Sequence, residues 1–530
     1  MMDPATGKAA GAGSSGVRLA ELVGTLSLAV DLGLGQPMEH VARSCLLASR
    51  LGERMGLDDA ERASLYYVSL LGWLGCIADS HDASVYFGDD IEYRAGVYDV
   101  DMKPLPFLGY LLRHAGTGSS PTRRLGVRAG LVATGARKVQ DSLRVHCQVT
   151  RAIAERLGLD DAVCVPLLHI FARWDGKGLP SDIAGDQIAR PIRLWHVTDV
   201  AEVHHRRGGV DAAVEVARRR SGSQFDPAVV DAFCAEADAL FAGLPEDSTW
   251  DALVDAEPAL QVPLTEERFD VALGVFADFA DLKVPALRGH SRGVAELAAD
   301  AGRRLGMTPG EVRTLRNAAL VHDLGRTGVP NTILEKTGPL TTAEQERLRL
   351  HSYYTERMLA RPQRLRELGS IAALAHERLD GSGYHRGLTA PVIPRSARVL
   401  AAADSYQAML EPRAGAAAHQ AGEAAQALQD EVRAGRLDAE AVDAVLAAAG
   451  QGAMRRVSGP AGLTPRETQV LELVARGLSN RQIARRLDIT PKTAGNHIER
   501  IYAKAGVSTR AAATLFAMQH GLLSSPISTS

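Results

Sequence analysis

An internal repeat constrains this chain more than any other feature of its sequence. Residues 172–180, ARWDGKGLP, resemble residues 377–385, ERLDGSGYH, at an offset of 205 positions, whereas His40 corresponds to His290 at an offset of 250. Self-similarity at a nearly fixed offset predicts two copies of one structural unit. The difference between the two offsets predicts an insertion of 45 residues in the first copy, within residues 75–146.

The composition predicts an all-α protein with several domains. Aromatic residues make up only 5% of the 530 residues, so the cores must be built from Ala, Leu and Val at helical spacing. The longest nearly apolar run, residues 66–78, is too short to cross a bilayer, and the N-terminus lacks an apolar signal segment. The five cysteines contain no CxxC pair, which argues against a disulfide framework or a thiolate zinc site. We therefore expect a soluble cytoplasmic protein.

Charge and composition divide the chain into segments. Residues 461–520 contain nine Lys and Arg against four Asp and Glu, although the whole chain has a net charge of -3. A basic segment on an acidic body predicts a polyanionic partner for that segment alone. The expected segments are a disordered tail (1–16), a first helical half (17–245), a second helical half (246–450), a linker (451–460) and a C-terminal domain (461–530).

The second half places histidines and aspartates on the inward faces of separate helices. A single inward histidine is more often a satisfied core residue than a ligand, but six such groups are costly to bury without a compensating cation. Mixed nitrogen and oxygen ligands suit Fe, Mn, Zn or Mg, and a bridging aspartate would allow two ions to activate water for attack on a phosphoryl group. The predicted ligands are His290, His322, Asp323, His351, His376 and Asp404.

Two motifs in this half resemble a known family. The segments HDLGRTGVPNTILEKTGPLT (322–341) and HERLDGSGYHRGL (376–388) are similar to the HD-GYP branch of the HD-domain metal-dependent phosphohydrolases. The resemblance implies one ion held by His290, His322, Asp323 and Asp404, with Asp323 bridging to a second ion held by His351 and His376. It also implies hydrolysis of cyclic di-GMP, with Asp323 and Arg326 as catalytic residues and Arg326, Tyr384 and Arg413 in contact with the substrate.

Several positions depart from the pattern of that family. Arg326 replaces a lysine and can clamp phosphate with two hydrogen bonds, which a lysine cannot do. Ala375 precedes His376 where the family usually has a second histidine, and the GYP motif reads Gly-Tyr-His at 383–385. Gln407 stands where an acid is common after the final aspartate.

The first half is predicted to be a degenerate copy without two metal ions. Gly72 and Trp73 stand where the second half has His322 and Asp323, and Phe171 replaces His376. Only three of the six predicted ligands are retained, namely His40, His146 and Asp199. We expect this half to serve ligand sensing, dimerisation or support. Asp79, His81 and Asp82 are interpreted as a solvated polar turn.

The C-terminal domain has the pattern of a helix-turn-helix. Thr464 and Ser479 are predicted to cap two short helices, and a third helix with a polar face follows Pro491. Residues 461–522 closely resemble the LuxR-type helix-turn-helix. That resemblance implies that Lys492, Thr493, Asn496, His497 and Arg500 face DNA, and that Arg481, Lys504 and Arg510 contact phosphates.

Together these features predict two tandem HD-domain-like helical bundles followed by a small LuxR-type domain. The favoured function is a regulator that binds double-stranded DNA as a homodimer and carries a metal-dependent phosphohydrolase or nucleotide-sensing module. Its ligand would be a cyclic dinucleotide or another phosphodiester. One alternative is an active cyclic di-GMP phosphodiesterase with an accessory DNA-binding tail. Another is a ligand-sensing regulator without turnover, so whether the protein is an enzyme stays open.

Overall fold

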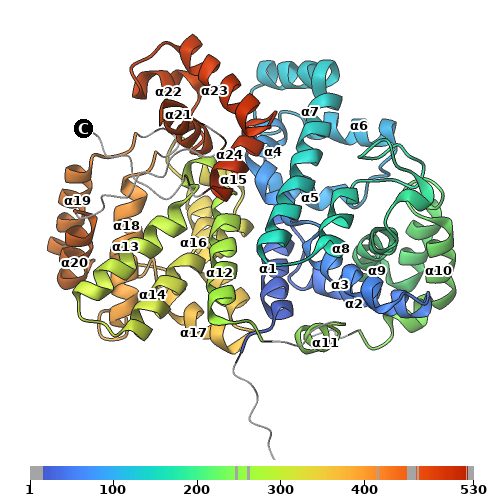
Figure 1. Ribbon diagram of the computed structural model, residues 1–530, viewed down its shortest axis with the longest axis horizontal. Helices are drawn as coiled ribbons and strands as arrows, with labels where there is room; N and C mark the ends of the chain where they lie inside the picture. Colours follow the sequence, from blue (N-terminus) through green and yellow to red (C-terminus); the bar gives the residue numbers. More distant parts are fainter. Residues whose placement is uncertain are drawn as a thin grey trace, which may run out of the picture.

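The architecture is seen in a computed structural model of the chain (Figure 1). Within the described residues there are helices, turns and three isolated bridges but no strand, which confirms the all-α prediction. The predicted linker 451–460 and residues 1–15 of the predicted tail lie outside the described residues. The structure describes residues 16–244, 249–258, 263–412, 415, 417–450, 461, 463, 465–520 and 522.

The helices fall into three groups along the chain, which correspond to the two halves and the C-terminal domain. The first half contains α1 (Leu19–Gly33), α2 (His40–Arg54), α3 (Asp59–Leu71), α4 (Ser80–Phe87), α5 (Asp90–Val97), α6 (Pro104–His114), α7 (Pro121–Arg156), α8 (Asp161–Cys164), α9 (Arg190–Arg220, broken at Gly208 and Gly209), α10 (Pro227–Phe241) and α11 (Trp250–Asp255). The second half contains α12 (Glu266–Asp281), α13 (His290–Arg304), α14 (Pro309–Val321), α15 (Asn331–Leu334), α16 (Thr342–Leu359), α17 (Gln363–Ala372), α18 (Arg395–Met409), α19 (Ala421–Arg433) and α20 (Ala439–Ala449). The C-terminal domain contains α21 (Pro465–Ala475), α22 (Asn480–Arg486), α23 (Pro491–Ala505) and α24 (Arg510–Gln519).

The repeat in the sequence is a repeat in the structure. The α2 and α13 helices begin at His40 and His290, and each follows a residue with positive φ. In the first half the Val41 amide donates to Asp31 over 3.0 Å, and in the second half the Ser291 amide donates to Asp281 over 3.0 Å. Both contacts obey the offset of 250, so the two halves share one local design.

The region of the predicted insertion contains α4 to α6 and the first part of α7, whereas the second half has only the four-residue α15 between Gly328 and α16. These helices have a small hydrophobic cluster of their own, containing Phe87, Leu111 and Leu131. They lie next to the C-terminal domain, where α24 contacts α7 (Figure 1). The insertion therefore gives the first half a surface that the second half lacks.

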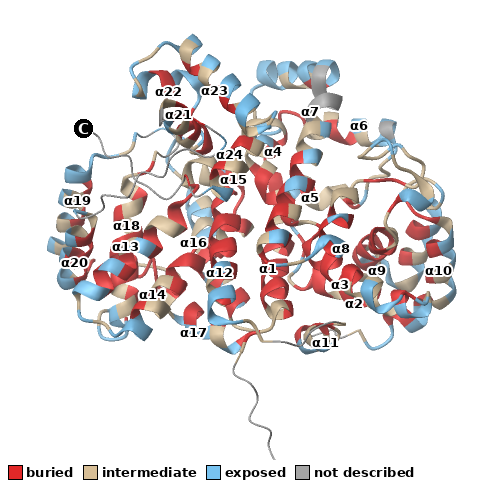
Figure 2. Cartoon of the chain, viewed as in Figure 1, coloured by how far each residue is buried: buried red, intermediate tan, exposed pale blue. Residues whose placement is uncertain are grey.

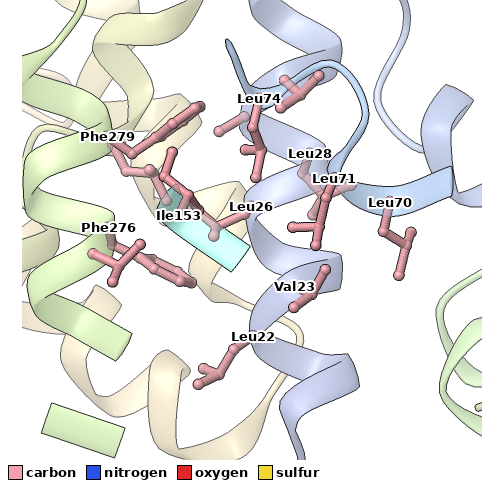
Figure 3. Packing of buried hydrophobic residues seen from close by; sticks show 14 of the residues in the cluster. Leu22, Val23, Leu26, Leu28, Leu70, Leu71, Leu74, Ile153, Phe276 and Phe279 are labelled. Carbon is pink, nitrogen blue, oxygen red and sulfur yellow. The ribbon is translucent and has the colours of Figure 1, made fainter. Parts of the chain in front are cut away.

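The two halves share one continuous hydrophobic core. That core extends from Val17 to Ala448, and buried segments run through both halves (Figure 2). In Figure 3, Phe276 of α12 and Leu26 of α1 belong to the same cluster as Ile153 of α7. The predicted division near residue 245 therefore separates the repeats in the sequence, while their apolar side chains pack together.

The C-terminal domain has a core of its own. Val470 and Leu471 of α21 pack with Ile483 of α22 and Ile501 of α23. Ser479 caps α22 by accepting from the Gln482 amide, as the sequence predicts, whereas the predicted cap Thr464 lies outside the described residues. None of the described helices in the chain combines the length and apolar character needed to cross a bilayer.

Candidate metal centre and nucleic-acid interface

The structure brings the six predicted ligands together in the interior of the second half. His290 begins α13, His322 and Asp323 follow α14, and the other three come from α16, the segment after α17, and α18. The exposed fraction of each residue is 9% or less. Two groups have the geometry of a cation site, His290 with His322 and Asp323, and Asp323 with His351 and His376. Asp323 is common to both groups.

The two oxygens of Asp323 face different histidines. Its Oδ2 lies 3.3 Å from His322 Nε2 and 3.4 Å from His290 Nε2. Its Oδ1 lies 3.6 Å from His351 Nε2 and 3.8 Å from His376 Nε2. This is the arrangement expected of a carboxylate that bridges two cations.

Asp404 extends the same cluster from α18. Its Oδ1 lies 3.2 Å from His290 Nε2, and its Oδ2 lies 3.4 Å from His376 Nδ1. Although burial raises the pKa of Asp404, His376 and the neighbouring histidines hold it well below its usual value. Asp404 is therefore an ionised ligand candidate.

The polar atoms that face this centre lack the partners that buried groups normally have. Nε2 of His290, His322 and His376, both oxygens of Asp323, and Oδ1 of Asp404 are buried without a hydrogen bond among the described residues, although Asp323 Oδ2 forms an ion pair with Arg326. Leaving such groups unsatisfied is costly, whereas divalent cations accept mixed imidazole and carboxylate ligands. The donor set therefore fits a pair of divalent cations.

Outer contacts orient the imidazoles toward the centre. His322 Nδ1 donates to the Ala319 carbonyl over 2.7 Å, and His351 Nδ1 donates to the Leu348 carbonyl over 2.6 Å. Such contacts fix the tautomer that leaves Nε2 available to a metal. Burial lowers the pKa of His351 to about 3, so its ring is neutral and can act as a ligand.

Sequence reasoning missed one residue of this outer layer, Glu411. His290 Nδ1 donates to Glu411 Oε2 over 2.9 Å, and Gln407 donates to the other oxygen over 2.8 Å. In the first half, Glu202 corresponds to Gln407 and contacts His40 directly over 2.5 Å. Glu411 lies one helical turn after Gln407 in the sequence. That spacing was the signal that could have identified Glu411 as the acid that contacts His290.

The predicted substrate-contacting residues lie beside the ligands where the structure describes them. Arg326 Nη1 is 2.6 Å from Asp323 Oδ2. The Tyr384 ring stacks on His376, with ring centroids 5.0 Å apart. Arg413 lies outside the described residues. A cleft of about 900 Å³ is lined by Arg326, Tyr384, His351 and His376.

A glycine allows the approach that brings Asp323 near His351. A Cβ added at Gly325 would lie 1.9 Å from the His351 carbonyl oxygen, and one added at Gly75 would lie 2.3 Å from the His146 carbonyl oxygen. No side chain fits at either distance. Gly75 and Gly325 thus allow the turn after the third helix of each half to lie against the helix that carries His146 or His351.

In the first half, Asp199 and His146 have hydrogen-bond partners within the protein. Trp73 donates its indole N–H to both oxygens of Asp199 at 3.1 Å. His146 Nε2 donates to the Gly72 carbonyl oxygen over 2.8 Å. Burial lowers the pKa of His146 to about 4, so this ring is neutral. Among the described residues of this half no group has metal-site geometry. A cavity of about 310 Å³ lies beside Trp73 instead.

The turn with Asp79, His81 and Asp82 differs from the solvated turn predicted for it. Asp79 pairs with Arg94 over 2.6 Å, and His81 contacts Glu335 of the second half over 2.8 Å. His81 and Asp82 line the cleft above the metal centre. This segment is therefore part of the contact between the two halves.

The predicted DNA-contacting residues lie mainly on exposed parts of the C-terminal domain. Lys492, Asn496 and Arg500 are exposed on α23, while Thr493 and His497 are half-buried. Arg481 is exposed, and the exposed Lys504 pairs with Glu467 over 2.6 Å. Arg510 is also half-buried, and it differs from the others because it lines the cleft of the second half.

Comparisons with known proteins agree with both motif assignments. Residues 274–441 match the HD domain family, and residues 461–517 match the luxR family of bacterial regulatory proteins. The chain is 28% identical over 399 residues to the 3'3'-cGAMP-specific phosphodiesterase 3 of Vibrio cholerae, covering 74% of this chain and 87% of that protein. It is 36% identical over 143 residues to a cyclic di-GMP phosphodiesterase of Thermotoga maritima, covering 27% of this chain and 38% of that protein.

A solved structure extends the similarity to both halves. A crystal structure of a cyclic GMP-AMP specific phosphodiesterase of V. cholerae superposes with a TM-score of 0.57 at 25% identity. The match covers 82% of this chain and 98% of that one. This chain thus contains an HD domain in residues 274–441 and a LuxR-family domain in residues 461–517, and it is similar to phosphodiesterases of cyclic GMP-AMP and cyclic di-GMP.

Proposed function

We propose that this protein is a DNA-binding regulator whose second half binds two divalent cations and hydrolyses a cyclic dinucleotide. The observation that carries the proposal is the cluster of six buried ligand candidates around Asp323, in which Nε2 of three histidines and three carboxylate oxygens are buried without a hydrogen bond among the described residues. The names of the relatives identify cyclic GMP-AMP and cyclic di-GMP as the candidate substrates. Fe, Mn, Zn and Mg are the candidate ions.

Each part of the centre has a role in this proposal. His290, His322, Asp323 and Asp404 would hold one cation, and His351 and His376 would hold the second, with Asp323 shared. The cations would polarise a phosphoryl oxygen and lower the pKa of bound water. Arg326 points its guanidinium at the same centre, where it can pair with a substrate phosphate. Tyr384 offers a ring at the cleft wall on which a base can stack.

The C-terminal domain supports the regulatory part of the proposal. The exposed side chains of α23 can enter the major groove, and a homodimer would present two such helices to a two-fold operator. An active phosphodiesterase with an accessory DNA-binding tail is the second candidate, and the full ligand set supports it equally. Metal-dependent hydrolysis of a cyclic dinucleotide would distinguish these two candidates from a regulator that binds the nucleotide without hydrolysing it.

The test is hydrolysis of cyclic GMP-AMP and cyclic di-GMP by the full chain loaded with Mn or Fe, with metal content measured by mass spectrometry. We expect D323A to lose both bound metal and activity, because no neighbour can replace a bridging carboxylate. R326A should keep its metal while the KM for substrate rises. An active D323A protein, or loss of metal from R326A, would contradict the roles assigned here.

A further inference from the structure

The C-terminal domain is packed against the segment that precedes α13. Arg288 Nη1 donates to the Ala475 carbonyl over 3.1 Å and to Thr514 Oγ1 over 2.7 Å. A Cβ added at Gly477 would lie 2.6 Å from Pro285 Cβ, so the two backbones approach closely. Apolar side chains of α24, among them Leu515, pack against the main core. The LuxR-family domain therefore forms a specific contact with the HD domain.

This contact gives the cleft over the metal centre a wall from the DNA-binding domain. The residues that line the cleft include Arg326, His351 and Tyr384 of the HD domain, together with Leu478 and Arg510 of the LuxR-family domain. Its volume of about 900 Å³ is within the range of about 300–1,000 Å³ that ligand pockets have. A ligand that fills the cleft from the metal centre outward would touch both domains.

The interface also brings two arginines of like charge together, in a cleft that Asp82 and Glu335 also line. Neither Arg288 nor Arg510 forms an ion pair with a carboxylate of the described residues, and the Nε of each is buried without a hydrogen bond. Burial and the charge of Arg510 lower the pKa of Arg288 to about 10, while Asp82 and Glu335 oppose this shift. The buried Arg288 and the half-buried Arg510 have like charge, which favours an anion between them because it would pair with both.

We propose that Arg288 of the HD domain and Arg510 of the LuxR-family domain form an anion subsite for the second phosphate or the distal part of a cyclic dinucleotide bound at the metal centre. The inference rests on the proposed function, since it concerns the same cleft. The nucleotide would then hold the LuxR-family domain in its docked position. Hydrolysis to smaller products would remove the ligand that touches both domains.

The subsite couples nucleotide binding to DNA binding through Arg510. The resemblance to LuxR-type domains assigns Arg510 to a DNA phosphate, whereas the structure places it in the cleft wall, where it donates to the Leu478 carbonyl. One guanidinium cannot serve both anions at once. Nucleotide and DNA are therefore expected to lower each other's affinity, because thermodynamic coupling between two sites is reciprocal.

The first experiment measures the affinity of the metal-loaded full chain for a phosphorothioate analogue of 3'3'-cGAMP. R288Q and R510Q, one from each domain, should each bind about tenfold more weakly, with metal content and melting temperature retained. R485Q is the matched control, because Arg485 is exposed on α22 of the same domain. Unchanged affinity in both cleft variants would overturn the subsite, whereas a wild-type chain that holds no metal or binds no analogue would overturn the proposed function itself.

The second experiment measures coupling in the same preparations. The analogue should weaken the affinity of the wild-type chain for its DNA operator severalfold, and this effect should disappear in R510Q while persisting in R485Q. Hydrogen exchange of the backbone at residues 475–478 should slow when the analogue binds. DNA affinity that is independent of the analogue in the wild-type chain would overturn the coupling.

Discussion

The indole N–H of Trp73 is shared between the two carboxylate oxygens of Asp199, each 3.1 Å away. At the corresponding position of the second half, Asp323 lies among histidines and shares a neighbourhood with Asp404. A neutral donor thus stands in the first half where the second half has a predicted ligand, and the remaining carboxylate has a partner within the protein. The two halves therefore share a helical frame, whereas among the described residues only the second half groups side chains in metal-site geometry.

This difference between the halves gives the first prediction. D404N should lower the metal content of the full chain, because it removes the charge of a buried ligand candidate. D199N, at the corresponding position of the first half, should leave metal content unchanged. Mass spectrometry of the purified full-length variants measures both. A loss of metal in D199N would show that the first half holds an ion of its own.

The second prediction concerns Glu411, which sequence reasoning did not identify. E411A should weaken metal binding about 10-fold to 100-fold, because it removes the carboxylate that orients His290 and supports its basicity. Competition with a metal chelator measures the affinity. E346A is the control, since Glu346 is exposed on α16 and pairs only with Arg349 among the contacts described. Equal metal affinity in E411A and the wild type would remove Glu411 from the outer layer.

The third prediction concerns the close approach at Gly325. G325A should reduce the free energy of unfolding by about 1–3 kcal/mol, because its methyl group would overlap the His351 carbonyl oxygen. G310A is the control, because Gly310 lies in α14 with nothing within 4 Å of an added Cβ. That substitution should leave stability unchanged or raise it by up to about 1 kcal/mol. Denaturant titration followed by circular dichroism compares the two, and equal stability of G325A and the wild type would contradict the steric argument.

The fourth prediction concerns DNA. K492A and N496A should lose sequence preference, at roughly 1–3 kcal/mol for each base contact, because both residues are exposed on α23. K504A should lower the affinity for all DNA sequences alike, as expected of a residue that contacts a phosphate. Affinity for operator and random DNA across a range of salt concentrations measures these effects, and wild-type affinity should fall steeply with salt. Identical behaviour of the two kinds of variant would mean that the assignment of α23 to the groove is wrong.

The sequence alone was sufficient for the features that depend on local periodicity. His290 begins α13, and α14, which precedes His322, begins at a capping box of Thr308 and Glu311. Helical spacing predicted the all-α class, and a local capping pattern predicted that Ser479 caps α22. These features follow from hydrogen bonds and side-chain spacing within a few residues, which any sequence window contains.

Only the tertiary structure decided which distant segments meet. Glu411 replaces the missing acid at Gln407 because the end of α18 lies beside the start of α13, and no local pattern fixes that distance. The shared core of the two halves and the position of Arg510 in the cleft wall depend on packing between segments far apart in the chain. The sequence determined the inventory of chemical groups and the helix faces that carry them. The packing of apolar surfaces, which is non-directional and acts between whole helices, determined which of those groups share a site.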